Sequence, residues 1–184
     1  IGYIGTTEKY CAEQGRDFAA YWKQPGTRIV HVIGKDIAYF HCLFWPAVLA
    51  HSGYNTPDRV QVHGFLTVNG QKMSKRSGTA VTAETYLEHL DPQLLRFYYA
   101  TKLGPTNADL DLNLEDFVNR VNADLVNKIA NLASRAHGFA RSKLGGKVTE
   151  LDSNAEALIA VAETRFQVIR EAYAGFEFGR AVRE

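Results

Sequence analysis

The sequence has 184 residues, of which 46% are hydrophobic and 22% charged, a composition typical of a globular protein with one or two domains. Its 21 Lys and Arg residues and 20 Asp and Glu residues leave a formal net charge of +1, so any contact with nucleic acid must be local. Cys11 and Cys42 are far apart and follow no Cys-x-x-Cys spacing, which argues against a disulfide framework or a zinc knuckle and favours a reducing compartment.

Two further expectations come from the hydropathy and the ends of the sequence. No apolar run approaches the about 20 residues that a membrane span needs, and the amino terminus lacks a basic segment followed by an apolar one. We therefore expect a cytoplasmic protein with no membrane partner. The sequence begins at Ile1, holds its only methionine at Met73 and stops inside a helical pattern, so we also expect a piece of a longer protein.

A strand, a turn and a helix are predicted after an opening region of short helices and loops over residues 3–22. The β-branched run over residues 28–33 predicts a strand that ends at Gly34, and Asp36 is expected to cap a helix that runs to about His51. Helical spacing places two neighbouring apolar stripes on this helix, and we expect both to be buried. The stripes are Ile37, His41 and Trp45, and Phe40, Phe44 and Val48.

A predicted β-hairpin carries the most informative loop of the sequence. Apolar and polar residues alternate over residues 59–68 and are followed by Asn69-Gly70, which predicts the hairpin. Beyond it, Lys72 and Lys75 stand three apart in a loop flanked by glycines, where their charge suits a polyphosphate and a mobile loop can stabilise departing pyrophosphate. A solvated basic turn is the alternative, but the position directly after a hairpin turn favours a nucleotide.

The rest of the sequence is predicted to be helical, and capping residues predict where three helices begin. They are Thr82 before residues 83–89, Asp91 with Pro92 before residues 93–102, and Asn113 before a long helix that we expect to end near Gly138. A further apolar stripe lies between Leu158 and Tyr173, beyond a Gly145-Gly146 linker. This arrangement predicts an antiparallel helical pair that begins a bundle.

The loop Lys72-Met73-Ser74-Lys75 resembles the signature loop of the class I aminoacyl-tRNA synthetases, usually Lys-Met-Ser-Lys-Ser, and its context resembles the methionyl-tRNA synthetases of that class. The segments that carry the resemblance are Ile1-Gly2-Tyr3-Ile4-Gly5, Ile33-Gly34-Lys35-Asp36-Ile37 through Trp45-Pro46, Val68-Asn69-Gly70-Gln71-Lys72, and residues 111–117 through Arg135. The resemblance is good over roughly residues 1–140 and loose beyond them. Arg76-Ser77 reverses the usual order, which moves one charge by one position.

The resemblance implies an α/β fold followed by helices. Residues 1–65 would be the carboxyl-terminal half of a class I Rossmann-like catalytic domain, residues 66–112 a module that carries the signature loop, and residues 113–184 the beginning of an anticodon-binding α-helical bundle. The family's first half-fold, with its His-Ile-Gly-His type signature, and its inserted domain, where zinc is frequent, are missing, and His31-Val32-Ile33-Gly34 is only a superficial echo of that signature. We therefore expect no metal site in this chain. We also expect the chain to be inactive alone and prone to self-association through the exposed edge of half a parallel sheet.

The resemblance also implies a reaction. Methionine and ATP, with Mg²⁺ in the substrate complex, would form methionyl-adenylate, and the methionyl group would pass to tRNA(Met) in protein biosynthesis. The implied catalytic residues are Lys72 and Lys75; the ATP-binding residues are these two with Gly34, Lys35, Asp36 and Leu66; the methionine-binding residues are Tyr3, Ile37, His41 and Trp45; the anticodon-binding residues are Asn131 and Arg135.

The residues alone also allow plainer interpretations. A glycine between a strand and a helix N-terminus suits a nucleotide, but it is also an ordinary turn. The aromatic face suits a thioether, but it is also a core face in which His41 is hydrogen-bonded. Asn131 and Arg135 suit unstacked bases, but they are also typical exposed residues of an amphipathic helix.

Two functional alternatives stay open as well. One is a class I synthetase for cysteine, leucine or valine, against which the choice of Tyr3, His41 and Trp45 favours methionine. The other is an RNA- or protein-docking module derived from a synthetase body, against which the retained lysine pair argues.

Overall fold

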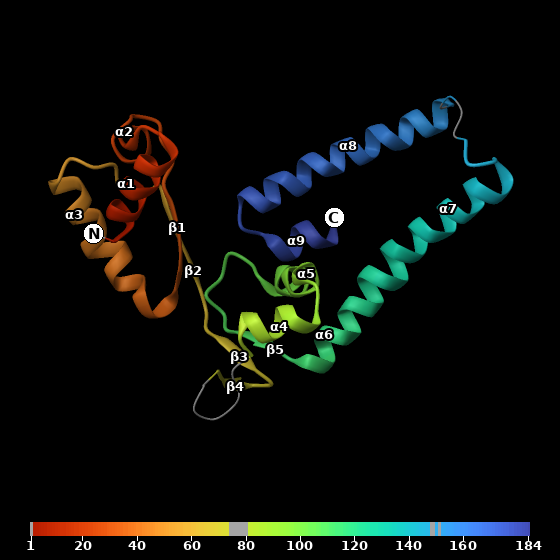
Figure 1. Ribbon diagram of the computed structural model, residues 1–184, viewed down its shortest axis with the longest axis horizontal. Coiled ribbons are helices and arrows are strands. Elements are labelled where there is room, and N and C mark those ends of the chain that lie inside the picture. The colour runs from red at the N-terminus through yellow and green to blue at the C-terminus, as the bar shows by residue number, and fades with distance from the viewer. Residues whose placement is uncertain (1, 74–80, 148–149, 151) are drawn as a thin grey trace. The chain divides into compact units, whose positions relative to one another are not determined.

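The computed structural model describes residues 2–73, 81–147, 150 and 152–184 (Figure 1). The chain forms two compact units, Ile1–Gly64, coloured red through orange in Figure 1, and Phe65–Glu184, coloured yellow through blue. The predicted division into three domains, with boundaries at residues 65 and 112, stays a prediction.

The first unit is built on a two-stranded parallel sheet. Strand β1 (Val30–Gly34) pairs with β2 (Arg59–His63) in the register from Val30 opposite Arg59 to Gly34 opposite His63. Parallel neighbours need a crossover connection, and the helical run from Lys35 to His51 supplies it. Helices α1 (Gly2–Gln14) and α2 (Phe18–Trp22) precede the strands. Two parallel strands joined by a helical crossover confirm the predicted α/β class.

The crossover helix is irregular, and it begins two residues earlier than predicted. It consists of a 3-10 turn, η1 (Lys35–Ile37), a π-helical stretch, η2 (Phe40–Phe44), and helix α3 (Trp45–His51). Gly34 holds the N-cap position and no side chain caps the first turn. The predicted capping role of Asp36 is therefore wrong, because this residue already lies inside the turn.

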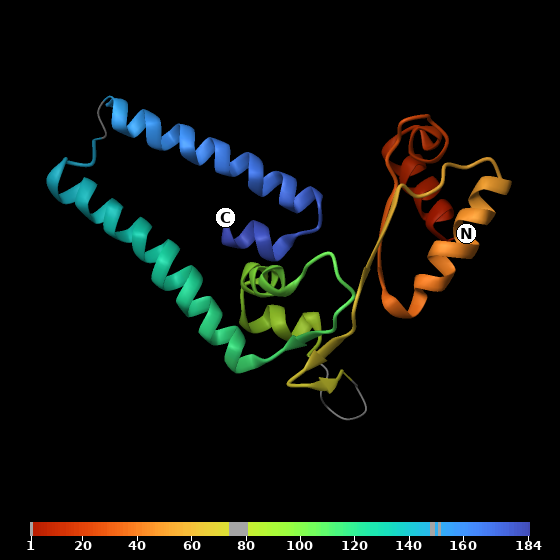
Figure 2. The ribbon, with the colours of Figure 1, turned by 180° about the vertical axis from the view of Figure 1, so that it is seen from behind.

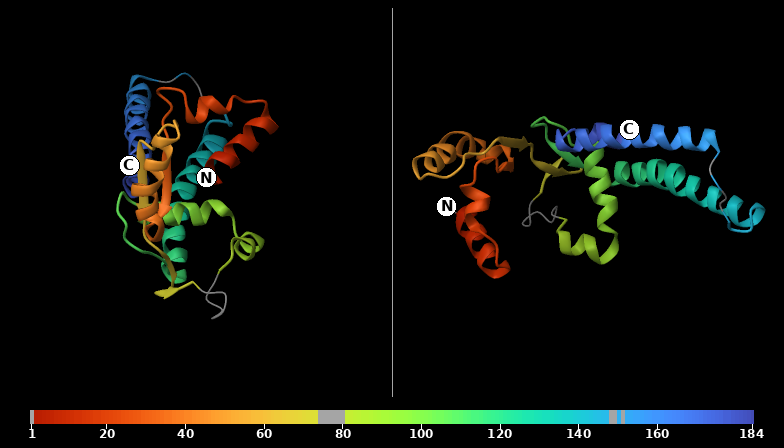
Figure 3. Two further views of the ribbon diagram at one scale, coloured as in Figure 1. Left: turned by 90° about the vertical axis from the view of Figure 1, so that its left-hand side faces the viewer. Right: turned by 90° about the horizontal axis from the view of Figure 1, so that it is seen from above.

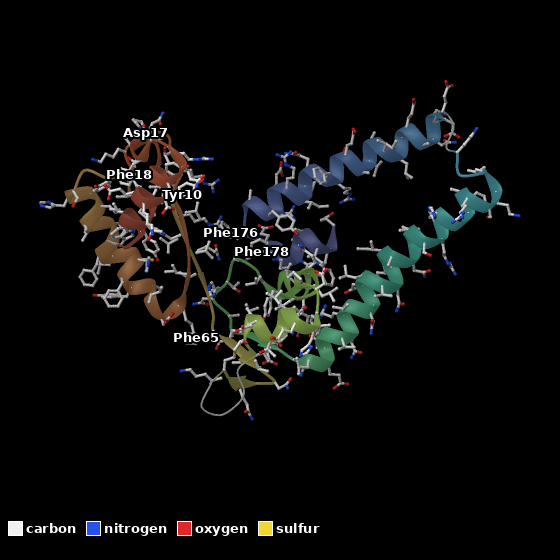
Figure 4. All side chains as sticks on the ribbon, in the orientation of Figure 1. Tyr10, Asp17, Phe18, Phe65, Phe176 and Phe178 are labelled. Atoms are coloured by element: carbon white, nitrogen blue, oxygen red, sulfur yellow. The ribbon has the colours of Figure 1, made fainter. Side chains whose placement is uncertain are left out.

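The core of the first unit is small and sits between these elements. Its most buried hydrophobic side chains are Cys11, Trp22, Ile33 and Leu49. Asp17, labelled in Figure 4 with its neighbour Phe18, caps α2 by accepting a hydrogen bond from the Ala19 N–H at 2.9 Å. The core thus joins both N-terminal helices to β1 and α3.

The second unit opens with a three-stranded sheet of order β4-β3-β5. Strands β3 (Leu66–Val68) and β4 (Gln71–Lys72) are antiparallel about Asn69 and Gly70, whose φ angles of 48° and 74° confirm the predicted hairpin turn. Strand β5 (Leu110–Leu112) pairs with β3 in parallel. Residues 59–68, whose alternation leads into the predicted hairpin, form two separate strands, β2 and β3, which belong to different sheets.

Helices make up the rest of the second unit. They are α4 (Ala83–His89), α5 (Pro92–Lys102), α6 (Leu114–Arg120), the π-helical η3 (Val121–Ala130), α7 (Asn131–Lys143), α8 (Ser153–Ala174) and α9 (Phe178–Arg183). The three predicted caps are confirmed: Thr82 accepts from the Thr85 N–H, Asp91 from the Gln93 N–H and Asn113 from the Asp116 N–H.

The long helix from α6 through η3 to α7 runs without a break past Gly138 (Figure 3). The prediction that it ends near Gly138 is therefore wrong. It ends instead after Lys143, where Gly145 and Gly146 adopt φ angles of 60° and 75°. Left-handed glycines of this kind end helices, whereas a single interior glycine only weakens one.

The last helices reverse the chain direction, as predicted, but the apolar stripes do not cover each other. Helix α8 runs back toward α9 (Figure 2), and α9 packs against α5. Phe178 at the start of α9 makes edge contacts with Tyr173 and Phe176, close to the labels in Figure 4. However, Leu132 and Leu158 are 71% and 73% exposed, so the stripes of α7 and α8 remain open to solvent. Within the described ranges, no helix has the length and apolarity that a bilayer crossing requires.

Candidate functional site

Four aromatic side chains from three elements meet in the first unit. They are Tyr3 of α1, His31 of β1, and His41 and Trp45 of the crossover helix. The Tyr3 ring centroid lies 5.0 Å from that of His31, 5.7 Å from that of His41 and 5.9 Å from that of Trp45. We call these four residues the aromatic cluster. Three of them, Tyr3, His41 and Trp45, were assigned to methionine binding by the resemblance.

Hydrogen bonds fix the protonation pattern of His41. Its Nδ1 lies 2.9 Å from the carbonyl oxygen of Ile37, and because a carbonyl only accepts, Nδ1 carries the proton. In neutral His41 the other nitrogen, Nε2, is then an acceptor, and it lies 2.9 Å from the Tyr3 hydroxyl. Tyr3 therefore donates to His41, which ties α1 to the crossover helix.

A second hydrogen bond joins the crossover helix to the sheet. The Trp45 indole Nε1–H donates to Nε2 of His31 at 3.0 Å, so neutral His31 carries its proton on Nδ1. The His31 side chain is buried. Burial lowers the pKa of His31, and the nearby His41 lowers it further, so the neutral acceptor form is favoured.

An open cavity of about 630 Å³ lies against the aromatic cluster. It is lined by Gly2, Tyr3, Thr6, Phe40, His41, Phe44, Trp45 and Val48. The predicted burial of the second stripe is thus wrong: Phe40, Phe44 and Val48 are 59%, 50% and 48% exposed. The crossover helix turns its first stripe toward α1 and β1, which leaves the second stripe facing this cavity.

Ile37 meets the aromatic cluster in a different way from the other three predicted methionine-binding residues. It contributes its backbone carbonyl to His41, while its side chain is 38% exposed. The geometry therefore supports a role for Ile37 in orienting His41.

The predicted nucleotide-binding turn lies at the carboxyl end of β1. Gly34 is paired with His63 at the carboxyl end of the parallel sheet, and Lys35 and Asp36 follow in η1. Ligands of parallel α/β sheets usually bind at this end of the strands. A Cβ on Gly34 would stand 2.7 Å from the carboxylate oxygen Oδ1 of the exposed Asp36, so a larger residue at position 34 would require this carboxylate to move.

The other predicted ATP-binding residues belong to the second unit. Leu66 lies on β3 and is packed against the core of that unit, and Lys72 ends β4 with an exposed side chain. Lys75 falls in residues 74–80, outside the described residues.

The base of the hairpin that carries Lys72 is held by a polar network. The Asp111 carboxylate oxygen Oδ1 accepts hydrogen bonds from the Thr67 hydroxyl and the Gly70 N–H, both at 2.7 Å. The Thr67 and Gly70 hydrogen bonds lower the pKa of Asp111. The side-chain oxygen of Asn69 accepts from the N–H of Leu114, so the hairpin turn is also tied to the start of α6.

The two predicted anticodon-binding residues share one face of α7. Asn131 and Arg135 are exposed and stand one helical turn apart. The Asn131 side-chain amide donates to the backbone carbonyl of Asn127 at 3.3 Å. Both side chains are accessible to a macromolecular ligand.

Sequence reasoning missed His31 as a member of the site. It was treated only as part of a superficial echo of another motif. The alternation along β1 was a usable signal, because a histidine on the same strand face as the buried Ile33 must find a hydrogen-bond partner. Trp45, which the sequence places on an apolar stripe of the following helix, is that partner.

Comparisons with known proteins agree on one family. The family described as tRNA synthetases class I (M) matches residues 1–137. The whole chain is 52% identical over 183 residues to methionine–tRNA ligase 1 of Sorangium cellulosum and 51% identical over 190 residues to methionine–tRNA ligase of Nitrosomonas europaea. It spans only 26% and 27% of the length of these relatives.

Solved structures give the same result. Methionyl-tRNA synthetase of Mycobacterium tuberculosis in complex with methionyl-adenylate matches 84% of this chain, over 31% of its own, with a TM-score of 0.72 and 32% identity. The apo form of that enzyme matches the same share of this chain, over 30% of its own, with a TM-score of 0.68 and 28% identity.

Proposed function

Because this chain belongs to the family of class I tRNA synthetases (M), we propose that it forms part of a cytoplasmic methionine–tRNA ligase. The activity would be the ATP-dependent formation of methionyl-adenylate and the transfer of the methionyl group to tRNA(Met). The observation that carries this proposal is the aromatic cluster beside an open cavity, because three of its four members, Tyr3, His41 and Trp45, are residues that the resemblance assigns to methionine.

The cavity suits the side chain of methionine. Its walls are the rings of Tyr3, Phe40, Phe44 and Trp45 with the aliphatic Val48. A thioether gains a modest stabilisation from contact with aromatic rings and has no strong hydrogen-bonding group to satisfy. Since Tyr3, His41 and Trp45 already use their polar hydrogens within the chain, these three walls of the cavity favour an apolar side chain.

The ATP part of the proposal rests on the carboxyl end of β1 and on the hairpin formed by β3 and β4. Gly34 allows Asp36 to hold its carboxylate over the carboxyl end of β1, where it would accept hydrogen bonds from ribose hydroxyls. Lys72 and Lys75 would bind the triphosphate, carried as the Mg²⁺ complex, and Lys75 would stabilise the charge that builds on departing pyrophosphate. Leu66 and Lys35 complete the proposed nucleotide contacts.

The tRNA part rests on α7. Asn131 and Arg135 would contact unstacked anticodon bases, since both are exposed on one helix face and offer polar groups to base edges.

The test is amino-acid-dependent ATP/pyrophosphate exchange. Because the chain spans about a quarter of its relatives, we would graft it in place of the matching segment of the Nitrosomonas europaea protein and compare methionine with leucine, valine and cysteine. Exchange with methionine alone supports the proposal. Exchange with another amino acid supports a class I synthetase of other specificity, and no exchange from a folded chimera favours the docking module.

A second arm tests the signature loop. Lys75→Ala in the chimera is expected to slow adenylate formation by about a hundredfold or more and to change methionine binding little, because the charge is needed in the transition state. Equal losses in the rate of adenylate formation and in the affinity for methionine would contradict the role assigned to Lys75.

A further inference from the structure

We infer that His31 is a positioning residue of the methionine pocket, which fixes the orientation of the Trp45 indole and through it the affinity for methionine. The inference rests on the proposed function. It adds to the site a strand residue that the resemblance does not assign.

The geometry is a single directed hydrogen bond across two elements. The indole Nε1–H of Trp45 donates to Nε2 of His31 at 3.0 Å. This N–H is the only polar group of the indole. Once it is held by β1, the indole presents only hydrocarbon surface to the cavity that Trp45 lines. A thioether finds apolar contacts with this ring, whereas a polar side chain finds no donor on it.

His31 is the more rigid member of the pair. It is 8% exposed and lies in the middle of a paired strand, opposite Val60 of β2. The rings of Tyr3 and His41 lie 5.0 and 5.7 Å from its own ring. Trp45 is half-buried and borders the open cavity on one side, while its ring meets that of Trp22 at 6.2 Å on another. His31 therefore orients Trp45 rather than the reverse.

The neutral form of His31 is required for this role. A protonated imidazole has no lone pair to accept the indole proton. The rings that contact His31 are those of Tyr3, His41 and Trp45, of which His41 is the other imidazole. Burial and this neighbour both favour neutral His31, so the hydrogen bond is intact at pH 7.

The experiment compares two amide substitutions in the chimera described above. His31→Gln and His31→Asn both remove the imidazole, but glutamine carries its amide at the distance of Nε2 and asparagine at that of Nδ1. Asparagine therefore loses the Trp45 contact, which leaves an indole N–H without its partner. We expect His31→Asn to raise the KM for methionine about tenfold with little change in kcat or in the KM for ATP. We expect His31→Gln to keep the KM for methionine within about threefold of that of the unsubstituted chimera.

A double-mutant cycle with Trp45→Phe shows whether the effect passes through Trp45. Phenylalanine lacks the N–H. In the Trp45→Phe background, His31→Asn is therefore expected to raise the KM for methionine by a further factor of less than about two. An unchanged methionine KM in His31→Asn, equal losses in both amide variants, or a full further loss in the Trp45→Phe background would each overturn the inference while the unsubstituted chimera remains active. An unsubstituted chimera without methionine-dependent exchange would overturn the proposed function and this inference with it.

Discussion

The aromatic cluster of the first unit and the core around Tyr98 of the second unit use the same kinds of side chain with opposite results. Tyr98 is 0% exposed, and its ring packs with Val68, Tyr86, Leu112, Phe117 and Val121. Tyr3 is 44% exposed and borders an open cavity. An aromatic stripe in a sequence therefore does not by itself distinguish a core from a pocket. The space left beside the rings does.

Polar contacts differ between the two regions as well. The Tyr98 hydroxyl lies 3.0 Å from the Asp116 carboxylate, which also pairs with Lys102 at 2.8 Å. These bonds join α5 to α6, and the Tyr98 hydroxyl also lies 3.3 Å from the backbone carbonyl oxygen of Asp111 in β5. In the aromatic cluster the polar hydrogens of Tyr3, His41 and Trp45 instead form hydrogen bonds that orient the rings. The first arrangement serves stability and the second serves a binding surface.

The largest expected effect tests the core side of this comparison. Tyr98→Ala removes a fully buried ring and its hydroxyl, and we expect it to lower the free energy of unfolding of the second unit by about 3–5 kcal/mol. Tyr98→Phe, the matched control, keeps the ring and is expected to lose about 1 kcal/mol. Urea unfolding measures both. Similar stability of Tyr98→Ala and the unsubstituted protein would erase the distinction between core and pocket.

The pocket side is tested by Trp45→Ala in the chimera. We expect the KM for methionine to rise about a hundredfold, because an aromatic wall and its contacts with the thioether are lost. The melting temperature should fall less than in Tyr98→Ala, since Trp45 is only half-buried. Phe139→Ala, which changes a 60% exposed ring on α7, should alter neither quantity. A large loss of stability with an unchanged methionine KM would make Trp45 a core residue.

A smaller effect is expected at the strand end. Gly34→Ala places a Cβ 2.7 Å from the Asp36 carboxylate oxygen, which must then move. We expect the KM for ATP in pyrophosphate exchange to rise about tenfold, the cost of one displaced charged hydrogen bond. Gly104→Ala is the control, because a Cβ there meets no heavy atom within 4 Å. Equal effects of the two substitutions would remove Asp36 from the nucleotide site.

The smallest effect concerns acid stability of the second unit. The hydrogen bond from Lys102 lowers the pKa of Asp116, and those from Thr67 and Gly70 lower the pKa of Asp111. Carboxylates with a lowered pKa stabilise the fold above their ordinary pKa, and this stability is lost as the pH falls through the lowered value. Urea unfolding should therefore show stability that decreases below about pH 4.

Asp116→Asn should flatten that decrease and cost about 1 kcal/mol or less at pH 7, because Asp116 is 36% exposed and solvent screens the pair. Asp124→Asn is the matched control, since its partner Lys128 is 73% exposed. If Asp124→Asn has the larger effect, the polar network around Tyr98 is not a stabilising feature.

Most caps and turns were predictable from the sequence, although the cap at Asp36 and the helix end near Gly138 were predicted wrongly, and long-range pairings were not predictable. Caps at Thr82, Asp91 and Asn113 and the turn at Asn69-Gly70 depend on a few adjacent residues, and all four are confirmed. The pairing of β3 with β5 joins segments about 40 residues apart, for which no local pattern exists. The alternation across residues 59–68 is broken only at Gly64 and Phe65, a signal for the division between β2 and β3 that the hairpin prediction did not use.

The candidate site shows the same limit. Helical spacing correctly placed His41 and Trp45 on one face, but it wrongly predicted burial of Phe40, Phe44 and Val48, because periodicity shows which residues share a face and not what covers that face. His31 was missed since its role depends on a partner 14 positions away. Its neutral state depends on burial, which a single sequence does not show directly.

The central claim is that the aromatic cluster forms a methionine pocket, and a crystal structure of the chimera with bound methionine tests it most directly. We expect the thioether sulfur within about 5 Å of the Tyr3 and Trp45 rings, with the Trp45 indole N–H still donating to His31. Methionine bound away from this cluster, while Tyr3, His41 and Trp45 keep the contacts described above, would contradict the account.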